Sequence, residues 1–201
     1  MTAESVSGRR LNLDEYFALE EASRVRHEFV DGVAFAMSGG TPSHSLITAN
    51  LIGTLHRVLA DSPRRAFNSD LRIAALESAF YTYPDVAVVC REYLTDPRNA
   101  NTVVNPSLLV EVLSPSTEAW DRGGKFERYR QIPSLQEYVL VSQHRPLVEH
   151  FVRQERGWLL RLAVGLDGEW TPACAGKSIA LQDIYDGVRF SEESESRPAR
   201  A

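Results

Sequence analysis

The sequence predicts a mixed α/β domain with a central β-sheet packed by helices, and three observations lead to this fold class. Segments with apolar residues at helical spacing alternate with short β-prone segments along the chain. The stretch VVNPSLLVEVLS has the run of aliphatic and β-branched residues that is typical of a buried central strand. A length of 201 residues with 43% hydrophobic residues fits one ordinary domain with its own core.

Caps and turns define the N-terminal elements. Asn12 is a good N-cap for a first helix, and Glu15 three residues later completes a capping box. Asp31-Gly32 stands between two β-prone runs, which predicts a hairpin. Thr41-Pro42 predicts the N-cap and the first residue of a second helix, and Asp61-Ser62-Pro63 ends it.

Strands dominate the rest of the chain. We predict strands from Ala66 to Ala74, from Tyr81 to Cys90 and from Ser107 to Leu113. A helix is expected from Asp121 to Gln131, because Ile132-Pro133 then stops helical growth. The later β-prone segments predict three more strands, at residues 138–142, 147–153 and 158–164.

The sequence indicates a single domain over residues 11–190, since no internal repeat or interior linker divides it. Residues 1–10 are polar and are expected to form a flexible leader, and the charged tail at 191–201 is expected to be disordered. No apolar run approaches the ~20 residues that cross a bilayer, and the first residues lack a secretory signal. We therefore expect a cytoplasmic protein without membrane contact.

The two cysteines and the net charge exclude some classes of protein. Cys90 and Cys174 have no close cysteine or histidine cluster in the sequence, so we expect buried thiols, not a zinc site or a disulfide framework. A formal net charge of −5 weighs against a passive nucleic-acid coat, which is usually basic. An enzyme that meets phosphates through a metal ion and a local basic patch remains compatible with this charge.

Two carboxylates stand in strands that are otherwise apolar. Asp85 follows Pro84 at the start of the run VAVV, and Glu111 interrupts LLVEVL. A carboxylate in such surroundings costs free energy unless it is paired. If the two lie on adjacent strands, they can converge on Mg²⁺, which prefers oxygen ligands. The alternatives are that Asp85 only ends a strand and that Glu111 faces solvent.

A basic segment, DRGGKFERYRQ, follows these strands. Lys125 lies early on the predicted helix, from which its ammonium can reach back over the end of the Glu111 strand. A metal beside a lysine suits phosphodiester hydrolysis, because the lysine orients water or stabilises developing negative charge. Arg122 and Arg128 are candidates for substrate contact. The alternative is that Lys125 is an ordinary surface lysine.

Three further positions near the predicted hairpin carry polar chemistry. Glu28 is a candidate fourth metal ligand, although acidic residues beside hairpins are common. His44, in the first turn of the second helix, is a candidate for phosphate contact or proton transfer, or else a plain surface histidine. Gly39-Gly40 is either an anion-binding helix start or a tight connection, and no Walker-type lysine follows it.

The ordered segments HEFVDG, GGTPSHSLI, YPDVAVV, LLVEVLSPST and DRGGKFERYRQIPSLQEYVLV resemble the Uma2 family of endonucleases. That family is similar in fold to the PD-(D/E)xK nucleases, so the resemblance implies a restriction-endonuclease-like core. It covers about Leu13 to about Arg161. PDVAVV and VEVLSPST are its most specific pieces, because they occur together and in this order.

The resemblance also implies roles for individual residues. Asp85 and Glu111 are the catalytic metal ligands, with Glu28 and the backbone carbonyl of Val112 as further ligands. Lys125 matches the lysine that the Uma2 pattern carries on the next helix. The general nuclease pattern instead places lysine two residues after the second acid, where this chain has Leu113.

The implied activity is hydrolysis of DNA phosphodiester bonds with Mg²⁺, for which Mn²⁺ can substitute. DNA is the implied partner, and a homodimer is implied because two copies are needed to cut both strands. The alternative is a domain that keeps this fold as a non-catalytic binding or dimerisation module. The acidic net charge and the absence of lysine at position 113 favour that alternative.

Overall fold

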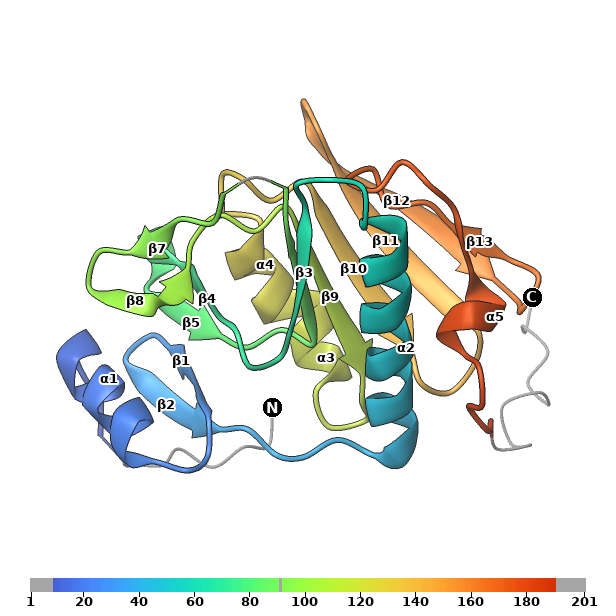
Figure 1. Ribbon diagram of the computed structural model, residues 1–201. Helices are drawn as coiled ribbons and strands as arrows, with labels where there is room; N and C mark the ends of the chain where they lie inside the picture. The colour runs from blue at the N-terminus through green and yellow to red at the C-terminus, as the bar shows by residue number, and fades with distance from the viewer. Residues whose placement is uncertain (1–8, 91, 191–201) are drawn as a thin grey trace.

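A computed structural model describes residues 9–90 and 92–190. The expected tail at 191–201, and all but the last two residues of the expected leader, lie outside the described residues. The described chain forms two six-stranded mixed sheets, a two-stranded sheet and surrounding helices (Figure 1). The mixed α/β class is confirmed, but the second large sheet was not expected.

The first sheet holds the N-terminal elements. Its strand order is β2-β1-β5-β4-β8-β7, and only β4 and β8 run parallel. The helix α1 (Leu13–Ala22) packs on it through Tyr16 and Phe17, which lie in a cluster of aromatic side chains. The strands are β1 (His27–Val30), β2 (Val33–Ala36), β4 (Arg72–Ala75), β5 (Phe80–Thr82), β7 (Thr95–Asp96) and β8 (Asn99–Val103).

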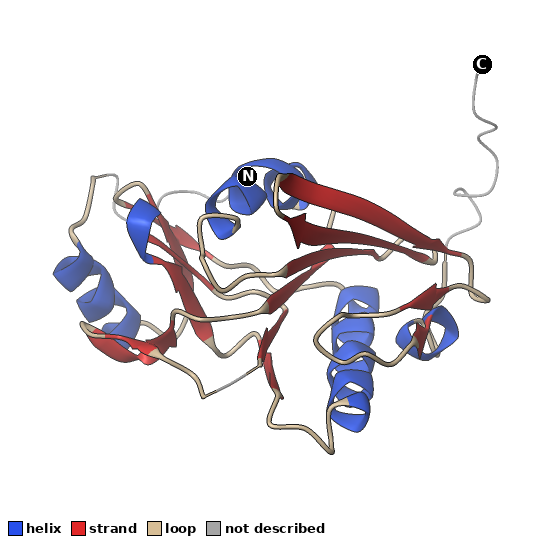
Figure 2. Ribbon diagram, turned by 90° about the horizontal axis from the view of Figure 1, so that it is seen from above, coloured by secondary structure: helices blue, strands red, loops and turns tan. Residues whose placement is uncertain are grey.

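The second sheet forms the centre of the molecule. Its strand order is β12-β11-β10-β9-β6-β3, with β9 and β10 parallel. The helix α2 (Pro42–Val58) covers one face, and the helical segment that follows β9 covers the other (Figures 1 and 2). The strands are β3 (Arg65–Asn68), β6 (Val86–Val89), β9 (Leu108–Leu113), β10 (Glu137–Ser142), β11 (Leu147–Gln154) and β12 (Gly157–Val164).

The caps and the first turn lie where the sequence predicts them. Asn12 and Glu15 exchange both hydrogen bonds of the capping box. Asp31 and Gly32 both have positive φ, 51° and 84°, which is the backbone of a two-residue hairpin turn. Thr41 accepts a hydrogen bond from the backbone of His44, and Pro42 opens α2.

Two of the predicted strands are each divided between the two sheets. The expected strand 66–74 is broken between β3 and β4, because Asn68 accepts a hydrogen bond from the backbone of Asp70 and turns the chain. The expected strand 81–90 is broken between β5 and β6 at Pro84, which has no N–H for a sheet. In both cases one half joins each sheet, so these breaks link the two layers.

The helix after β9 also differs from the prediction. It begins at Glu118, three residues earlier than expected, as α3 (Glu118–Trp120). A π-helical turn, η2 (Asp121–Lys125), follows and continues into α4 (Phe126–Tyr129). Gly124 is required within this turn, because a Cβ there would lie 2.1 Å from the Trp120 ring. Single π-turns inside helices are frequently found at functional sites.

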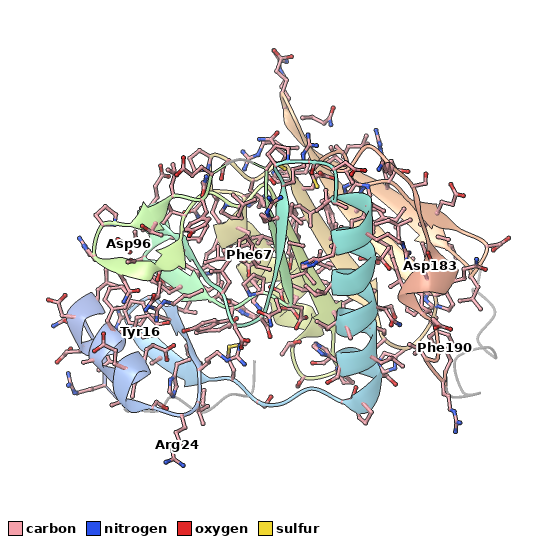
Figure 3. All side chains as sticks on the ribbon, viewed as in Figure 1. Tyr16, Arg24, Phe67, Asp96, Asp183 and Phe190 are labelled. Carbon is pink, nitrogen blue, oxygen red and sulfur yellow. The ribbon has the colours of Figure 1, made fainter. Side chains whose placement is uncertain are left out.

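The three strands predicted for residues 138–164 are confirmed as β10, β11 and β12. None of the described helices is long and apolar enough to span a membrane. Figure 3 marks the two ends of the molecule, with Tyr16 and Asp96 at the first sheet and Asp183 at α5. The unpredicted elements are β7, β8, a 3-10 turn η1 (Leu76–Ser78), β13 (Glu169–Trp170), β14 (Ile179–Ala180) and α5 (Leu181–Ile184).

The two cysteines contradict part of the prediction. Cys174 is buried as expected, but Cys90 is only half-buried, and the two thiols contact each other. The thiol of Cys90 also lies 2.7 Å from the hydroxyl of Ser107. Hydrogen bonding with Cys174 is the main cause that lowers the pKa of Cys90, to about 6, against the effect of burial. The contact between the two thiols could not be predicted, because Cys90 and Cys174 are far apart in the sequence.

Candidate active site

A pocket of about 460 Å³ opens where the two sheets meet. The break between β5 and β6, the end of β9, the first turn of α2 and the π-turn all border it. The lining residues are Glu28, Phe35, Ala36, Met37, Ser38, Gly39, Gly40, Thr41, His44, Tyr83, Asp85, Glu111, Val112, Ser114, Pro115, Ser116, Thr117, Trp120, Asp121 and Lys125.

The central strands place Asp85 and Glu111 on the same face of the second sheet. In the antiparallel ladder of β6 and β9, Val86 pairs with Val110, so the preceding Asp85 comes opposite Glu111. One carboxylate oxygen of Asp85, Oδ2, accepts a hydrogen bond of 2.7 Å from the backbone N–H of Val112. The two acids therefore come from adjacent strands, as the sequence predicts.

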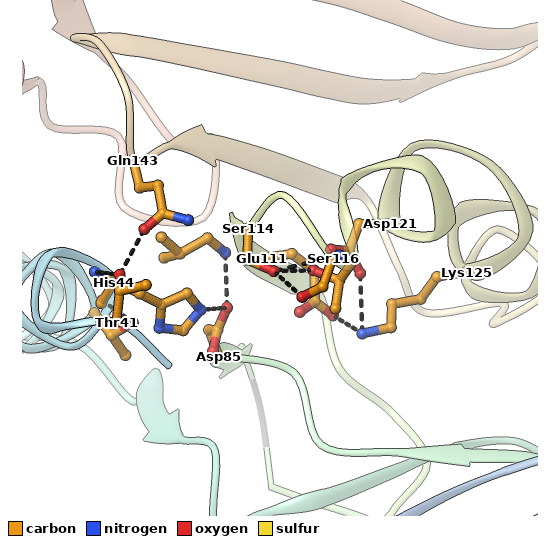
Figure 4. A network of polar contacts seen from close by, with 12 residues as sticks. Thr41, His44, Asp85, Glu111, Ser114, Ser116, Asp121, Lys125 and Gln143 are labelled. Atoms are coloured by element: carbon orange, nitrogen blue, oxygen red, sulfur yellow. Dashed lines mark hydrogen bonds and ion pairs between the residues drawn. The ribbon is translucent and has the colours of Figure 1, made fainter. Parts of the chain in front are cut away.

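Lys125 lies among three carboxylates, and Figure 4 shows those of Glu111 and Asp121 beside it. The Nζ of Lys125 is 2.9 Å from Glu28 Oε1, 3.2 Å from Glu111 Oε1 and 3.2 Å from Asp121 Oδ1. Side chains around it fix the same acids, because Tyr129 donates to Glu111 Oε1 at 2.8 Å and Thr82 donates to Glu28 Oε1. The π-turn places Asp121 and Lys125, four residues apart, on the same side of the helix.

The charges of this cluster do not balance. Four carboxylates, those of Glu28, Asp85, Glu111 and Asp121, face a single ammonium. Burial raises the pKa of Glu111 well above its usual value; Lys125 opposes this shift, and the neighbouring acids add to it. Burial would lower the pKa of Lys125, but the surrounding carboxylates raise it well above its usual value. Lys125 is therefore a charged, buried lysine.

His44, in the first turn of α2, contacts the carboxylate of Asp85. Its Nε2 lies 3.2 Å from Asp85 Oδ2, and its ring also meets the backbone carbonyl of Val112. Gly40 leaves room for this ring, because a Cβ there would lie 2.7 Å from His44 Nδ1. Burial lowers the pKa of His44, but the hydrogen bond and charge of Asp85, together with the charge of Asp121 and the backbone of Val112, raise it overall.

Most of the predicted site residues therefore lie together. Lys125, His44, Val112 and the acids at 28, 85 and 111 all line the pocket. Arg122 and Arg128 do not line it. Arg122 binds Glu118 and Glu149, while Arg128 binds Asp31 and lies over the Trp120 ring. Their contact with substrate stays a prediction.

Asp121 is a site residue that the sequence analysis missed. It is 2% exposed, and its Oδ1 has no hydrogen bond among the described residues, although it lies within ion-pair distance of Lys125. A signal for it was present, since an acid four residues before a lysine is a common helical pair. The predicted helix begins at Asp121, and the sequence analysis gives this residue no role in the site.

The donor chemistry suits a hard divalent cation. Among the described residues, no group of three or more His, Cys, Asp or Glu side chains is placed to hold a metal ion, and three of the acids contact Lys125 instead. Within the described chain, Asp85 nevertheless uses only Oδ2 for its contacts and Glu111 uses only Oε1. One oxygen of each acid stays open, and Mg²⁺ commonly takes one or two carboxylates and keeps several waters.

The chain is similar to several known proteins. It is 38% identical to the uncharacterized protein slr1290 of Synechocystis sp. over 90% of this chain and 94% of that protein. It is also 38% identical to the uncharacterized protein sll1609 of the same organism, over 79% and 90%. A solved structure from Anabaena variabilis, titled as a "putative nuclease belonging to DUF820", shares the fold with a TM-score of 0.71 at 18% identity, over 87% of this chain and 97% of that one.

Residues 13–181 match the Uma2 family, whose description is "Putative restriction endonuclease". This match extends from the first residue of α1 to the first residue of α5, so it contains both large sheets and every residue of the pocket. The family description indicates a nuclease, and the fold agrees with it. The chain therefore belongs to the Uma2 family.

Proposed function

We propose that this protein is a metal-dependent endonuclease that hydrolyses DNA phosphodiester bonds. The observation that carries the proposal is the convergence of Asp85, Glu111 and Lys125 in one pocket of a Uma2 family fold. The lysine comes from the helix after the second acid, and its ammonium reaches that acid from there. The lysine missing from position 113 is thus replaced in space by Lys125.

Asp85 and Glu111 would hold Mg²⁺, or Mn²⁺ in its place, through their open oxygens. The bound ion would polarise the phosphoryl oxygen and lower the pKa of a water ligand. The backbone carbonyl of Val112 and the second oxygen of Glu28 are the further ligands that we expect from the family pattern. Both residues line the pocket beside the two acids.

The acidity of the pocket is an argument for the cation. Phosphate is an anion, and four carboxylates with one ammonium repel it in a chain whose formal net charge is −5. Asp85 and Glu111 would offset this repulsion by holding a divalent ion, which would supply positive charge to the pocket. Binding of DNA in the pocket is therefore expected to require the metal.

Two basic side chains would act directly on the substrate. Lys125 carries a fixed positive charge at the pocket wall, where it would stabilise the negative charge that develops on the phosphoryl oxygens. His44 is held by Asp85, so its ring would offer a proton or a hydrogen bond to a phosphate oxygen. Asp121 and Glu28 would position Lys125 through their ion pairs.

The test is cleavage of supercoiled plasmid and of short single-stranded DNA, with Mg²⁺, with Mn²⁺ and with chelator. The variants Asp85→Asn and Lys125→Met should each lose at least 100-fold in rate at a temperature where circular dichroism shows both to be folded, the range for groups that stabilise a transition state. Asp70→Asn and Lys177→Met are matched controls, because both residues are exposed and neither lines the pocket. Cleavage that survives Asp85→Asn, or that persists in chelator, contradicts the proposal.

The second candidate function is a non-catalytic binding module of the same fold. The observation that favours it is the set of three ion pairs that engages Lys125 inside the protein. Calorimetry with Mn²⁺ separates the two functions. A folded wild-type protein that neither binds Mn²⁺ nor cuts DNA supports the module, whereas binding that Asp85→Asn abolishes supports the nuclease.

A further inference from the structure

The two cysteines of the chain meet on the face of the second sheet that α2 covers. Cys90 directly follows the last residue of β6, and Cys174 lies in the loop between β13 and β14. Both pack in the hydrophobic cluster of this face, where Cys174 is 7% exposed and Cys90 is only half-buried. Their thiols hydrogen-bond to each other, so the more exposed thiol of Cys90 has the buried thiol of Cys174 behind it.

The polar groups around Cys90 favour its thiolate. The hydroxyl of Ser107 lies 2.7 Å from Cys90 Sγ, and the guanidinium of Arg64 also hydrogen-bonds to this sulfur. The hydrogen bond from Cys174, which is the largest effect, and those from Ser107 and Arg64 lower the pKa of Cys90 to about 6, against the effect of burial. At neutral pH, Cys90 is therefore a thiolate, which is the nucleophilic form of cysteine.

The surroundings of Cys174 favour the opposite state. Its backbone N–H donates to Glu137 Oε1 at 3.0 Å, and the backbone N–H of Ala173 donates to Oε2 of the same carboxylate at 2.8 Å. Glu137 is 1% exposed, and its Oε2 lies 2.7 Å from His150 Nε2. The hydrogen bond to Cys90, burial and the charge of Glu137 all raise the pKa of Cys174. Cys174 is therefore a protonated thiol whose backbone a buried carboxylate holds in place.

The two environments assign different chemical roles to the two thiols. Cysteines that react with peroxides combine thiolate character, access to solvent and a second thiol that can close a disulfide. Cys90 has the first two properties, and Cys174 supplies the third. We propose that Cys90 attacks hydrogen peroxide and that Cys174 then closes a disulfide with it. This inference is independent of the proposed nuclease activity, because neither cysteine lines the pocket of the candidate active site.

The reaction has two steps. The Cys90 thiolate attacks one oxygen of the peroxide, so that an S–O bond forms, the O–O bond breaks and the hydroxide that leaves takes a proton from solvent. Cys90 is thereby oxidised to a sulfenic acid while the peroxide is reduced, and Arg64 would stabilise the charge on the departing hydroxide. The sulfur of Cys174 then attacks the sulfur of Cys90. The S–O bond breaks, and the hydroxide that leaves takes the thiol proton of Cys174 to form water.

Thiol titration and intact-mass spectrometry of the reduced full chain test the proposal. One equivalent of hydrogen peroxide per chain should remove both thiols and two hydrogen atoms from the mass, and a non-reducing gel should show a monomer. Dithiothreitol should restore both thiols, because it reduces a disulfide but not a sulfinic or sulfonic acid.

The two single variants test the roles and are matched controls for each other. Cys174→Ser should stop at the sulfenic acid of Cys90, which dimedone traps as a covalent adduct. Cys90→Ser should react with peroxide at least about tenfold more slowly than Cys174→Ser, because only a thiolate attacks and the remaining thiol is buried beside Glu137. In concentrated urea, where these environments are lost, the two variants should react at the same rate.

Circular dichroism in buffer must show that both variants fold. Equal rates for the two folded variants overturn the proposal, because the surroundings would then not select Cys90. A covalent dimer as the main product also overturns it, as does a wild-type chain that keeps both thiols after treatment with peroxide.

Discussion

Replacing Lys125 by methionine should strongly destabilise the fold, whether or not the pocket is catalytic. Methionine keeps most of the volume of the lysine stem but removes the ammonium. The side chains of Glu28, Glu111 and Asp121 would then be buried, at 9%, 6% and 3% exposure, without their shared cation. An unpaired buried charge is far more costly than the loss of a surface ion pair.

The magnitude follows from the burial of both partners. Removing one member of a buried ion pair costs about 3–5 kcal/mol. For a domain of this size, 1 kcal/mol lowers Tm by about 2–4 °C, so the expected fall is roughly 6–20 °C. Adding Glu111→Gln to Lys125→Met removes one of the buried acids that have lost their partner. The double variant should regain roughly 0.5–3 kcal/mol, the range for residues in direct contact.

Urea unfolding followed by circular dichroism gives the free energy of unfolding for each variant. The control is Lys177→Met, because Lys177 is the only other lysine and is exposed. It should change stability by less than about 0.5 kcal/mol. A cost below about 1 kcal/mol for Lys125→Met, or a double variant less stable than the single one, would refute the view that these carboxylates depend on Lys125.

Two further predictions concern the thiol pair and the glycines. The pKa of Cys90 is lowered to about 6, so the rate at which iodoacetamide alkylates this thiol should be constant above roughly pH 7 and fall below pH 6. Cys174→Ala should move the midpoint of this pH dependence upward, and a midpoint near about 8.5 in the wild type would contradict the contact between the two thiols. Gly32→Ala should cost about 1–2 kcal/mol in urea unfolding, because φ is +84° there, whereas Gly53→Ala, inside α2 and facing open space, should add about 0.5–1 kcal/mol.

The local elements could be predicted because their signals are local. A capping box at Asn12, a two-residue turn at Asp31-Gly32 and a proline after the N-cap Thr41 each satisfy backbone requirements within a few residues. These signals do not depend on what packs against them. All three therefore lie in the structure where the sequence places them.

The division into two sheets could not be read in the same way. The segments 66–74 and 81–90 are β-prone throughout, and their breaks at Asn68–Asp70 and at Pro84 were visible only as weak interruptions. Which half joins which sheet is decided by partners far away in the sequence. Periodicity reports that a residue lies in a strand, but it does not report the neighbouring strand.

The site was predictable in its composition and less so in its geometry. Asp85 and Glu111 stood out because a carboxylate in an apolar strand needs a partner, and they lie in one pocket. The partners themselves were harder to identify. The sequence predicts a helix that begins at Asp121, and the π-turn that brings this residue beside Lys125 has no sequence signature of its own.

Glu28 lies on a strand of the first sheet and Glu111 on a strand of the second. The pocket therefore forms only when the two sheets pack together. Each layer taken separately carries an incomplete set of acids, and Lys125 ties the two sets together. A partly folded chain on the ribosome, with one layer formed and the other still open, cannot assemble this arrangement. The full set of acids around Lys125 therefore exists only after both layers have formed and docked.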